Sequence, residues 1–217
     1  MFISSFTRQI KRILLHSTAD NMKIIDISKD IFESEVYPGD PAPCAQRVER
    51  MEDGADCNLT AMSLCLHNGT HIDAPRHFIK DGATAESLEL TRFIGECHVI
   101  EAPEGAMEKS FIAANLPENC KRLLIKGGGM AYFAQSGAEA AAEAGLLLVG
   151  TDSNSVGTHG AQVAPHRALL GAEIPLLEGL DLAQVKPGKY FLVALPLKFG
   201  SVEATPTRAI LISDPIG

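Results

Sequence analysis

Short apolar runs separated by glycine, proline and other turn-forming residues recur along the chain and predict a series of β-strands. The predicted strands span residues 23–28, 57–67, 122–126, 146–152, 189–199 and 207–214. The run CNLTAMSLCLH at 57–67 has only small polar interruptions, which is typical of a strand buried on both faces. Three glycines end the run at 122–126 and return the chain to a loop.

A different pattern predicts helices between some of these strands. Residues 136–145 read SGAEAAAEAG, in which Ser136 can cap a helix, the alanines favour it and Gly145 ends it. Proline at position 165 places His166 at the start of a second short helix. The stretch YPGDPAP at 37–43 predicts a loop. This mixture indicates an α/β fold with a mixed sheet and flanking helices.

The first 21 residues differ in character from the rest of the chain. The stretch FTRQIKRILLH is basic and weakly amphipathic, and it lacks the long apolar core and cleavage site of a secretory signal. We therefore expect residues 1–21 to be an N-terminal extension, with a mitochondrial-type presequence as the alternative. Residues 22–217 show no internal repeat or linker, and we expect them to form a single domain.

Composition narrows the classes of partner. Hydrophobic residues make up 46% of the chain and charged residues 21%, as in a soluble globular protein. The net charge of −8 argues against a nucleic-acid partner, which needs a basic surface. No apolar run approaches the roughly 18 residues of a membrane-spanning helix. The five cysteines are scattered without a C-x-x-C pair, which favours a reduced, cytoplasmic setting.

The stretch HNGTHIDAPRH at 67–77 concentrates three histidines and an aspartate. Proline within it bars a continuous helix, so the H-E-x-x-H arrangement is the wrong template. In an extended backbone His71 and Asp73 point to the same side. The Asn-Gly turn brings His67 back from the end of the preceding strand, and His77 follows the proline. The pattern matches a catalytic metal site with open positions; the alternative, buried histidines without a cation, leaves polar groups competing for partners.

A second group of candidate residues lies further along the chain. His166 follows Pro165, and Glu178 ends the apolar run IPLLE. Each also has an ordinary interpretation, as a helix-start residue and as a solvated turn residue. The isolated histidines His16, His98 and His159 are interpreted as core or surface residues.

The stretch HNGTHIDAPRHF resembles the H-x-G-T-H-x-D-x-P-x-H-F signature of the metal-dependent cyclase family. That family includes bacterial kynurenine formamidases (arylformamidases) and isatin hydrolases. The similarity extends to YPGDP, GTDSNSV, HRALLGAEIPLLEGL and ALPLKFGSVEATPTRAIL, and so covers nearly the whole chain from Met22 onward.

The resemblance implies a role for each candidate. His67, His71 and Asp73 would bind a metal, with Asp73 able to bridge to a second ion, and His166 and Glu178 would complete the binuclear site. His77 would donate and accept the proton. The implied fold is the swivelling β/β/α type, assembled as a homodimer or homotetramer. The implied cofactor is one or two divalent ions per chain, zinc in the formamidases and manganese in some relatives.

Some features depart from the formamidase pattern. Tyr37 stands where that branch tends to have tryptophan, and glycines follow Lys126 where relatives often have an arginine or threonine stretch. Lys126 either faces the pocket or is solvated. Asp152 either orients a ligand imidazole or caps the following turn. These departures bear on the substrate rather than on the metal.

The function predicted from these residues is a metal-dependent hydrolase that cleaves an amide-type bond of a small aromatic or cyclic substrate, as an arylformamidase does. A divalent cation lowers the pKa of bound water from about 15.7 towards 7, and His77 would carry the proton. The alternatives are a lactam or lactone hydrolase, a cyclase or dehydratase, and a metal-binding protein without turnover. Sequestration needs no proton carrier, so an intact His77 weighs against the last alternative.

Overall fold

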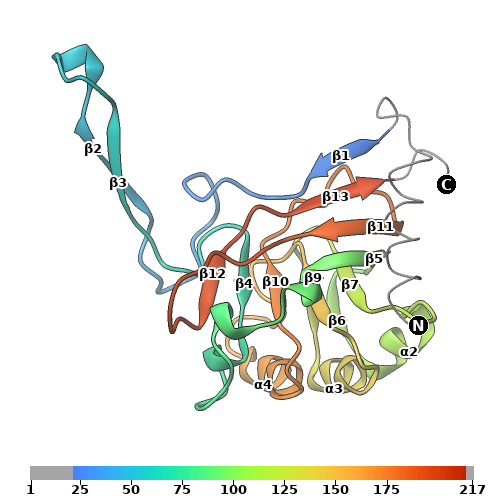
Figure 1. The fold of residues 1–217 in the computed structure, drawn as a ribbon. Helices are drawn as coiled ribbons and strands as arrows, with labels where there is room; N and C mark the ends of the chain where they lie inside the picture. Colours follow the sequence, from blue (N-terminus) through green and yellow to red (C-terminus); the bar gives the residue numbers. More distant parts are fainter. Residues whose placement is uncertain (1–21, 214–217) are drawn as a thin grey trace, which may run out of the picture.

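The computed structural model describes residues 22–213, which build a nine-stranded mixed sheet flanked by helices (Figure 1). In spatial order the strands are β1 (Lys23–Asp26), β13 (Ile210–Ser213), β11 (Gly188–Val193), β5 (Ile94–Glu101), β7 (Arg122–Lys126), β9 (Leu148–Thr151), β10 (Leu176–Glu178), β4 (His71–Asp73) and β12 (Ala204–Pro206). Strands β5, β7, β9 and β10 pair in parallel, and the strands outside them pair antiparallel. The predicted α/β fold with a mixed sheet is confirmed.

The parallel strands need crossover connections, and the helices supply them. The helices are α2 (Lys109–Asn115), α3 (Gln135–Glu143) and α4 (Val163–Gly171). All three lie together on one side of the central strands, whereas β1, β13 and β11 lie on the opposite side (Figure 1). A second small sheet pairs β6 (Gly105–Met107) with β8 (Ala131–Phe133).

The two faces of the central strands pack into two separate hydrophobic cores. Leu123 and Ile125 of β7 pack into the helix-side core with residues such as Ala138 of α3, whereas Leu124 belongs to the core on the other face. This alternation follows from the period of two in an extended chain. Because both faces are covered, β7 and β9 are apolar runs rather than alternating ones, as expected for buried parallel strands.

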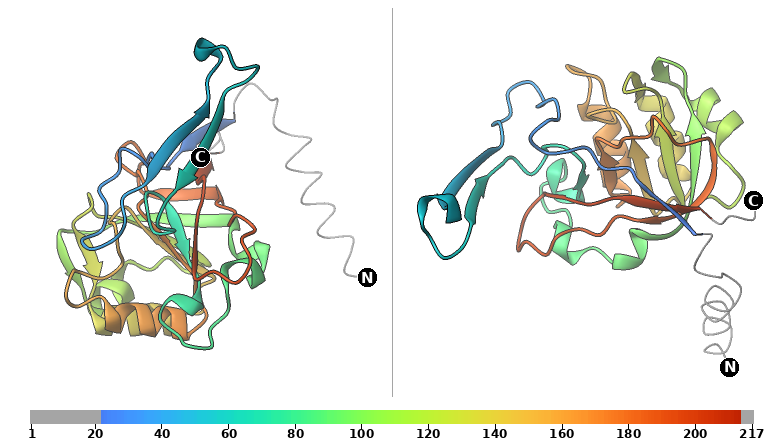
Figure 2. Two further views of the ribbon diagram at one scale, coloured as in Figure 1. Left: turned by 90° about the vertical axis from the view of Figure 1, so that its left-hand side faces the viewer. Right: turned by 90° about the horizontal axis from the view of Figure 1, so that it is seen from above.

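The strand predicted at 57–67 is present but shorter, and its predicted burial on both faces is wrong. The strand there is β3 (Leu59–Ser63), which pairs with β2 (Cys44–Glu49) in a hairpin whose residues are all exposed. The hairpin stands away from the rest of the structure in every view (Figures 1 and 2). An apolar run indicates that a strand meets another surface, but it does not say that the surface belongs to the same chain. Cys57, just before β3, is exposed as well.

The predicted helix at 136–145 is present as α3 and starts one residue earlier. Its N-cap is Ala134, not Ser136. The Ser136 hydroxyl instead donates to the Glu108 carboxylate and accepts the Lys109 N–H, which ties α3 to the start of α2. Gly145 has a φ of +68°, a conformation that favours glycine after a helix.

Residues 1–21, predicted to be an extension, lie outside the described part of the chain. Within residues 22–213, no helix is long and apolar enough to cross a membrane.

Candidate metal centre

The short strand β4 places two candidate ligands at the middle of the site. His71 and Asp73 are buried and point to the same side, with His71 Nε2 3.4 Å from Asp73 Oδ1. The antiparallel pairing of β4 with β10 sets Glu178 directly opposite His71. As a result, Glu178 Oε2 lies 3.5 Å from His71 Nε2. Sheet register therefore joins the two candidate groups that lie far apart in the sequence.

His67 reaches the same point from a turn rather than from the end of a strand, because β3 ends at Ser63. The Asn68 side chain accepts the N–H of Cys65 at 2.9 Å and so closes this turn. Gly69 follows with a φ of +65°. The turn returns His67 Nδ1 to 2.9 Å from Asp73 Oδ1.

His77 lies at the edge of the site. It ends a short 3-10 helix, η2 (Pro75–His77), which begins with the proline that the sequence pattern identified as a helix breaker. Its Nε2 is 3.8 Å from Asp73 Oδ2, and its side chain is 27% exposed, far more than the 2% of His71. Burial and the neighbouring imidazoles lower the pKa of His77, and the attraction of Asp73 only partly offsets them. His77 is therefore neutral at pH 7 and accessible from the pocket.

Helix α4 contributes His166 from the opposite side of the site. His166 Nε2 lies 3.4 Å from Glu178 Oε1 and 3.8 Å from Asp73 Oδ2. The prediction that the helix starts at His166 is wrong: it starts at Val163, so that Pro165 occupies its third position. A proline is tolerated there because the first-turn N–H groups have no partner within the helix.

Backbone carbonyls orient the two most buried imidazoles. The Nδ1–H of His71 donates to the carbonyl of Gly69 at 3.1 Å, and that of His166 donates to the carbonyl of Gln162 at 2.7 Å. Since a carbonyl only accepts, each ring keeps a proton on Nδ1, so that Nε2 faces the centre and is the nitrogen that could bind a metal once it has lost its own proton. The N–H of Val156 donates to Glu178 Oε1 at 2.7 Å and holds that carboxylate in place.

Asp152 does not orient a ligand, and neither of the two roles considered from the sequence is observed. Its carboxylate accepts the N–H groups of the three glycines 127–129, at 2.9 to 3.2 Å. Successive N–H groups form an anion-binding concavity, and the aspartate fills it. Lys126 does not face the pocket either, because its ammonium donates to the carbonyls of Ala183 and Val185.

Three buried polar atoms of the centre have no hydrogen-bond partner within the described chain. Both carboxylate oxygens of Asp73 and Nε2 of His71 are buried and unpaired. The Nδ1 of His67 is close to Asp73, but its N–H is not aligned for a hydrogen bond with it. Leaving several such groups unpaired is costly. A cation at their centre would satisfy all of them, so the residues fit a divalent metal.

Two groups of candidate ligands share Asp73. One consists of His67, Asp73 and His77, and the other of His71, Asp73 and Glu178; within each group the ligand atoms lie within 4.8 Å of one another. Shared membership suits a carboxylate that bridges two ions. The geometry also makes His77 a possible ligand, in addition to the proton-carrying role predicted for it.

Strong electrostatic interactions tie these groups together. Burial opposes charge on His71, but the two carboxylates of Asp73 and Glu178, each within 3.5 Å of its Nε2, outweigh burial and raise the pKa of His71 to about 10. The same balance raises the pKa of His67 and of His166. Burial acts in the opposite sense on Asp73, yet its histidine neighbours hold the pKa of that carboxyl well below its usual value. In the absence of a cation, protons supply the positive charge that the two carboxylates need.

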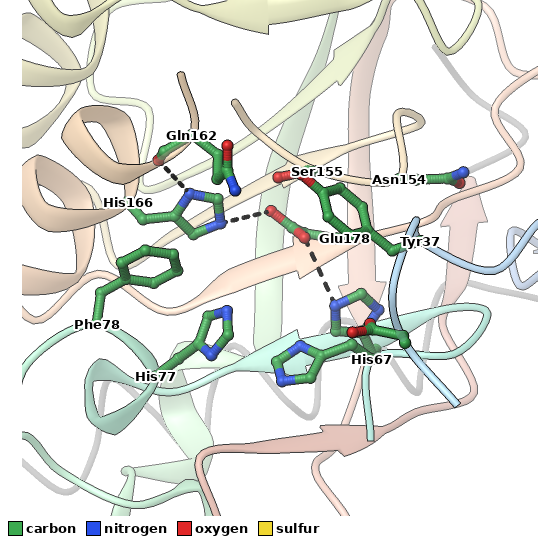
Figure 3. A pocket seen from close by; sticks show the side chains of 11 residues that line it. Tyr37, His67, His77, Phe78, Asn154, Ser155, Gln162, His166 and Glu178 are labelled. Atoms are coloured by element: carbon green, nitrogen blue, oxygen red, sulfur yellow. Dashed lines mark hydrogen bonds and ion pairs between the residues drawn. The ribbon is translucent and has the colours of Figure 1, made fainter. Parts of the chain in front are cut away.

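A cavity of about 160 Å³ opens beside these groups (Figure 3). Phe78 stacks on the His166 ring, with centroids 4.4 Å apart, and forms one wall. Tyr37 lies across the cavity from His77 and Phe78 (Figure 3). Tyr37, Glu178 and the four histidines that line the cavity were predicted from the sequence. Its other lining residues were not, namely Asp40, Phe78, Asn154, Ser155 and Gln162. Each of these lies in or next to a segment that carries the family resemblance, and that proximity was the available signal.

Comparisons with known proteins identify the family of this chain. The model of the Cyclase family, described as "Putative cyclase", matches residues 14–158. The chain belongs to this family. It is 34% identical to the kynurenine formamidase of Erythrobacter litoralis over 211 residues, covering 91% of this chain and 97% of the relative. It is likewise 34% identical to the kynurenine formamidase of Salinibacter ruber, covering 89% of this chain and 99% of the relative.

Solved structures share the fold of this chain. A predicted metal-dependent hydrolase from Bacillus stearothermophilus is 27% identical, with a TM-score of 0.78 over 89% of this chain and 99% of the other. An isatin hydrolase bound to the product analogue thioisatinate superposes with a TM-score of 0.80 over 98% of this chain and 99% of the other. At 18% identity, the isatin hydrolase shows a shared fold and no more.

Proposed function

We propose that this chain is a metal-dependent hydrolase that cleaves the C–N bond of an aromatic formamide, as its kynurenine formamidase relatives are named for doing. The observation that carries the proposal is the position of Asp73. Both of its oxygens are buried and unpaired where two groups of ligands meet. A purely structural aspartate would be hydrogen-bonded at this depth.

The ligands support an ion bound by nitrogen and oxygen. His67, His71 and His166 supply imidazoles, and Asp73 and Glu178 supply carboxylates. Zinc accepts this mixture, and we propose zinc as the native metal, with manganese as the alternative. Asp73 as a shared ligand supports two ions per chain. When bound, the metal supplies water of lowered pKa and polarises the carbonyl of the substrate.

His77 is the proton carrier in this proposal. Its lowered pKa leaves the ring neutral at pH 7, so that it can accept a proton from water. Its exposure to the cavity lets it then deliver that proton to the leaving nitrogen. Phe78 packs edge-on against it, with ring centroids 4.5 Å apart, and limits its rotation. No serine or cysteine nucleophile is needed for this chemistry.

The cavity supports a small aromatic substrate. Its volume of about 160 Å³ is close to that of an apolar cavity that holds one benzene ring. Tyr37 and Phe78 provide aromatic surface on two sides. An aryl ring between them would place a formamide substituent beside His77.

A turnover screen of the zinc-loaded protein tests the proposal. We expect hydrolysis of N-formylkynurenine and of formanilide, and loss of both activities on treatment with a chelator. Isatin and a simple lactone in the same screen test the lactam and lactone alternative. A zinc-loaded protein that hydrolyses none of these would contradict the proposal and favour cyclase or dehydratase chemistry, or metal binding without turnover.

We also propose that the enzyme acts in the cytoplasm, which cell fractionation tests.

A further inference from the structure

Asp40 is a carboxylate in the cavity wall that no basic residue of the described part of the chain neutralises. It lines the cavity together with the candidate ligands. Its Oδ2 lies 3.7 Å from Sγ of Cys65, and a thiol is a weak donor. Among residues 22–213, no basic side chain forms an ion pair with it. Asp40 is therefore available to a ligand.

The other carboxylate that lines the cavity is not available to a ligand in the way that Asp40 is. Glu178 also lines the cavity, but its carboxylate is occupied by Val156, His71 and His166. No lysine or arginine is among the lining residues that the structure describes. A substrate carboxylate beside Asp40 would therefore meet a negative charge with no lysine or arginine of the described lining to compensate it.

The turn that carries Asp40 also carries the aromatic wall. The N–H of Asp40 donates to the carbonyl of Tyr37 at 3.0 Å, and Gly39 between them has a φ of +100°. The two side chains are thus held near each other. Burial raises the pKa of Tyr37, and the negative charges of Glu178 and Asp40 add to that effect. An aryl ring placed against Tyr37 would bring one of its substituents towards Asp40.

We propose that Asp40 is a specificity-determining residue that selects aromatic formamides carrying an ammonium group, an inference that rests on the function proposed above. Binding of an aromatic ring removes water from the half-buried carboxylate. That loss is costly unless the substrate returns hydrogen-bond donors or positive charge. An ammonium group returns both, a neutral substituent returns neither, and a carboxylate adds repulsion.

Three formamides of one aryl skeleton test this inference: formanilide, 3-(aminomethyl)formanilide and 3-(carboxymethyl)formanilide. For the zinc-loaded protein we expect kcat/KM to be highest for the ammonium compound and lowest for the carboxylate. From the ammonium compound to formanilide, and again from formanilide to the carboxylate, kcat/KM should fall about three- to tenfold, the scale of one partly exposed ion pair. In Asp40→Asn the three values should converge, while formanilide itself changes less than about threefold. Glu35→Gln is the matched control, because it removes the same charge from a residue that does not line the cavity. Glu35 nevertheless lies close to the cavity, since it accepts a hydrogen bond from the lining residue Asn154.

Two kinetic outcomes would overturn the inference: an unchanged order of the three substrates in Asp40→Asn, or an equal loss for all three. The equal loss would assign Asp40 to the chemistry instead. Calorimetric binding of benzylamine and phenylacetate gives a readout that does not depend on turnover. Preference for benzylamine that disappears in Asp40→Asn would support the inference even if no formamide is hydrolysed, a result that would contradict only the proposed function. Equal binding of the two compounds to the unmodified protein would overturn the inference.

Discussion

Glu178 lies directly opposite His71 in the pairing of β10 with β4, and 3.5 Å separates Oε2 of the first from Nε2 of the second. This single register relationship connects the two halves of the candidate site. A shift of one residue would turn Glu178 to the other face of the sheet. The segments that flank these strands therefore matter to the site even where they bear no ligand.

Gly179 is one such flanking residue. It has a φ of +66°, and a Cβ added there would clash with the carbonyl oxygen of Gly69, which precedes β4. We expect Gly179→Ala to lower the free energy of unfolding by about 2–4 kcal/mol, from backbone strain and displacement together, and to weaken metal binding. The measurements are denaturant unfolding and zinc titration.

Gly145→Ala is the control for that experiment. Gly145 has nearly the same φ, +68°, but a Cβ there would meet nothing within 4 Å. Gly145→Ala should lower the free energy of unfolding by only about 1 kcal/mol, from backbone strain. It should leave the zinc affinity unchanged. Equal effects of the two substitutions would show that the approach of Gly179 to Gly69 does not support the site.

Proton release on metal binding is expected from the raised histidine pKa values. With a pKa of about 10, His71 is protonated at pH 7 in the metal-free protein. A ligand imidazole must be unprotonated at the metal, so binding has to displace that proton. Metal affinity should therefore rise with pH through neutrality towards pH 10. Calorimetry of zinc binding at pH 7 in two buffers of different ionisation enthalpy should detect release of at least one proton; a heat independent of the buffer would contradict this.

The exposed hairpin of β2 and β3 leads us to expect self-association, as the family resemblance implied. An isolated two-stranded hairpin is marginally stable in water, yet this one carries Val48, Leu59 and Met62, each about half exposed. A second copy of the chain is the partner we propose. Light scattering should show a dimer or tetramer, and Met62→Glu should shift it towards the monomer. Met130→Glu changes a similarly exposed methionine away from the hairpin and should leave the assembly intact.

His77→Ala separates metal binding from proton transfer. We expect turnover of formanilide to fall by about 10²- to 10⁴-fold, the scale of a positioned acid–base group, while most of the metal is retained. His98→Ala, a histidine outside the cavity lining, should change neither property. Loss of metal in His77→Ala would instead make His77 a ligand, in line with its membership of one ligand group.

Local patterns predicted some features of the site well. The convergence of His71 and Asp73 depends only on strand alternation, and the return of His67 depends on a neighbouring turn. Local patterns could not predict the contact between His71 and Glu178, because register depends on pairing between distant segments, and only the family resemblance implied that the two residues share a site. The same holds for Asp152, whose partners are three glycines about 25 residues away. The apolar run at 57–67 predicts a buried strand, but β3 is exposed. The sequence does not indicate which surface, if any, covers this strand.

Metal content of Asp73→Ala tests the central claim most directly. Asp73 belongs to both ligand groups, and its two oxygens have no other partner in the described chain. The unmodified protein should bind about one to two zinc ions per chain, measured by elemental analysis after dialysis. Asp73→Ala should lose most of that metal while circular dichroism shows a folded chain. Full metal occupancy in a folded Asp73→Ala protein would contradict the account.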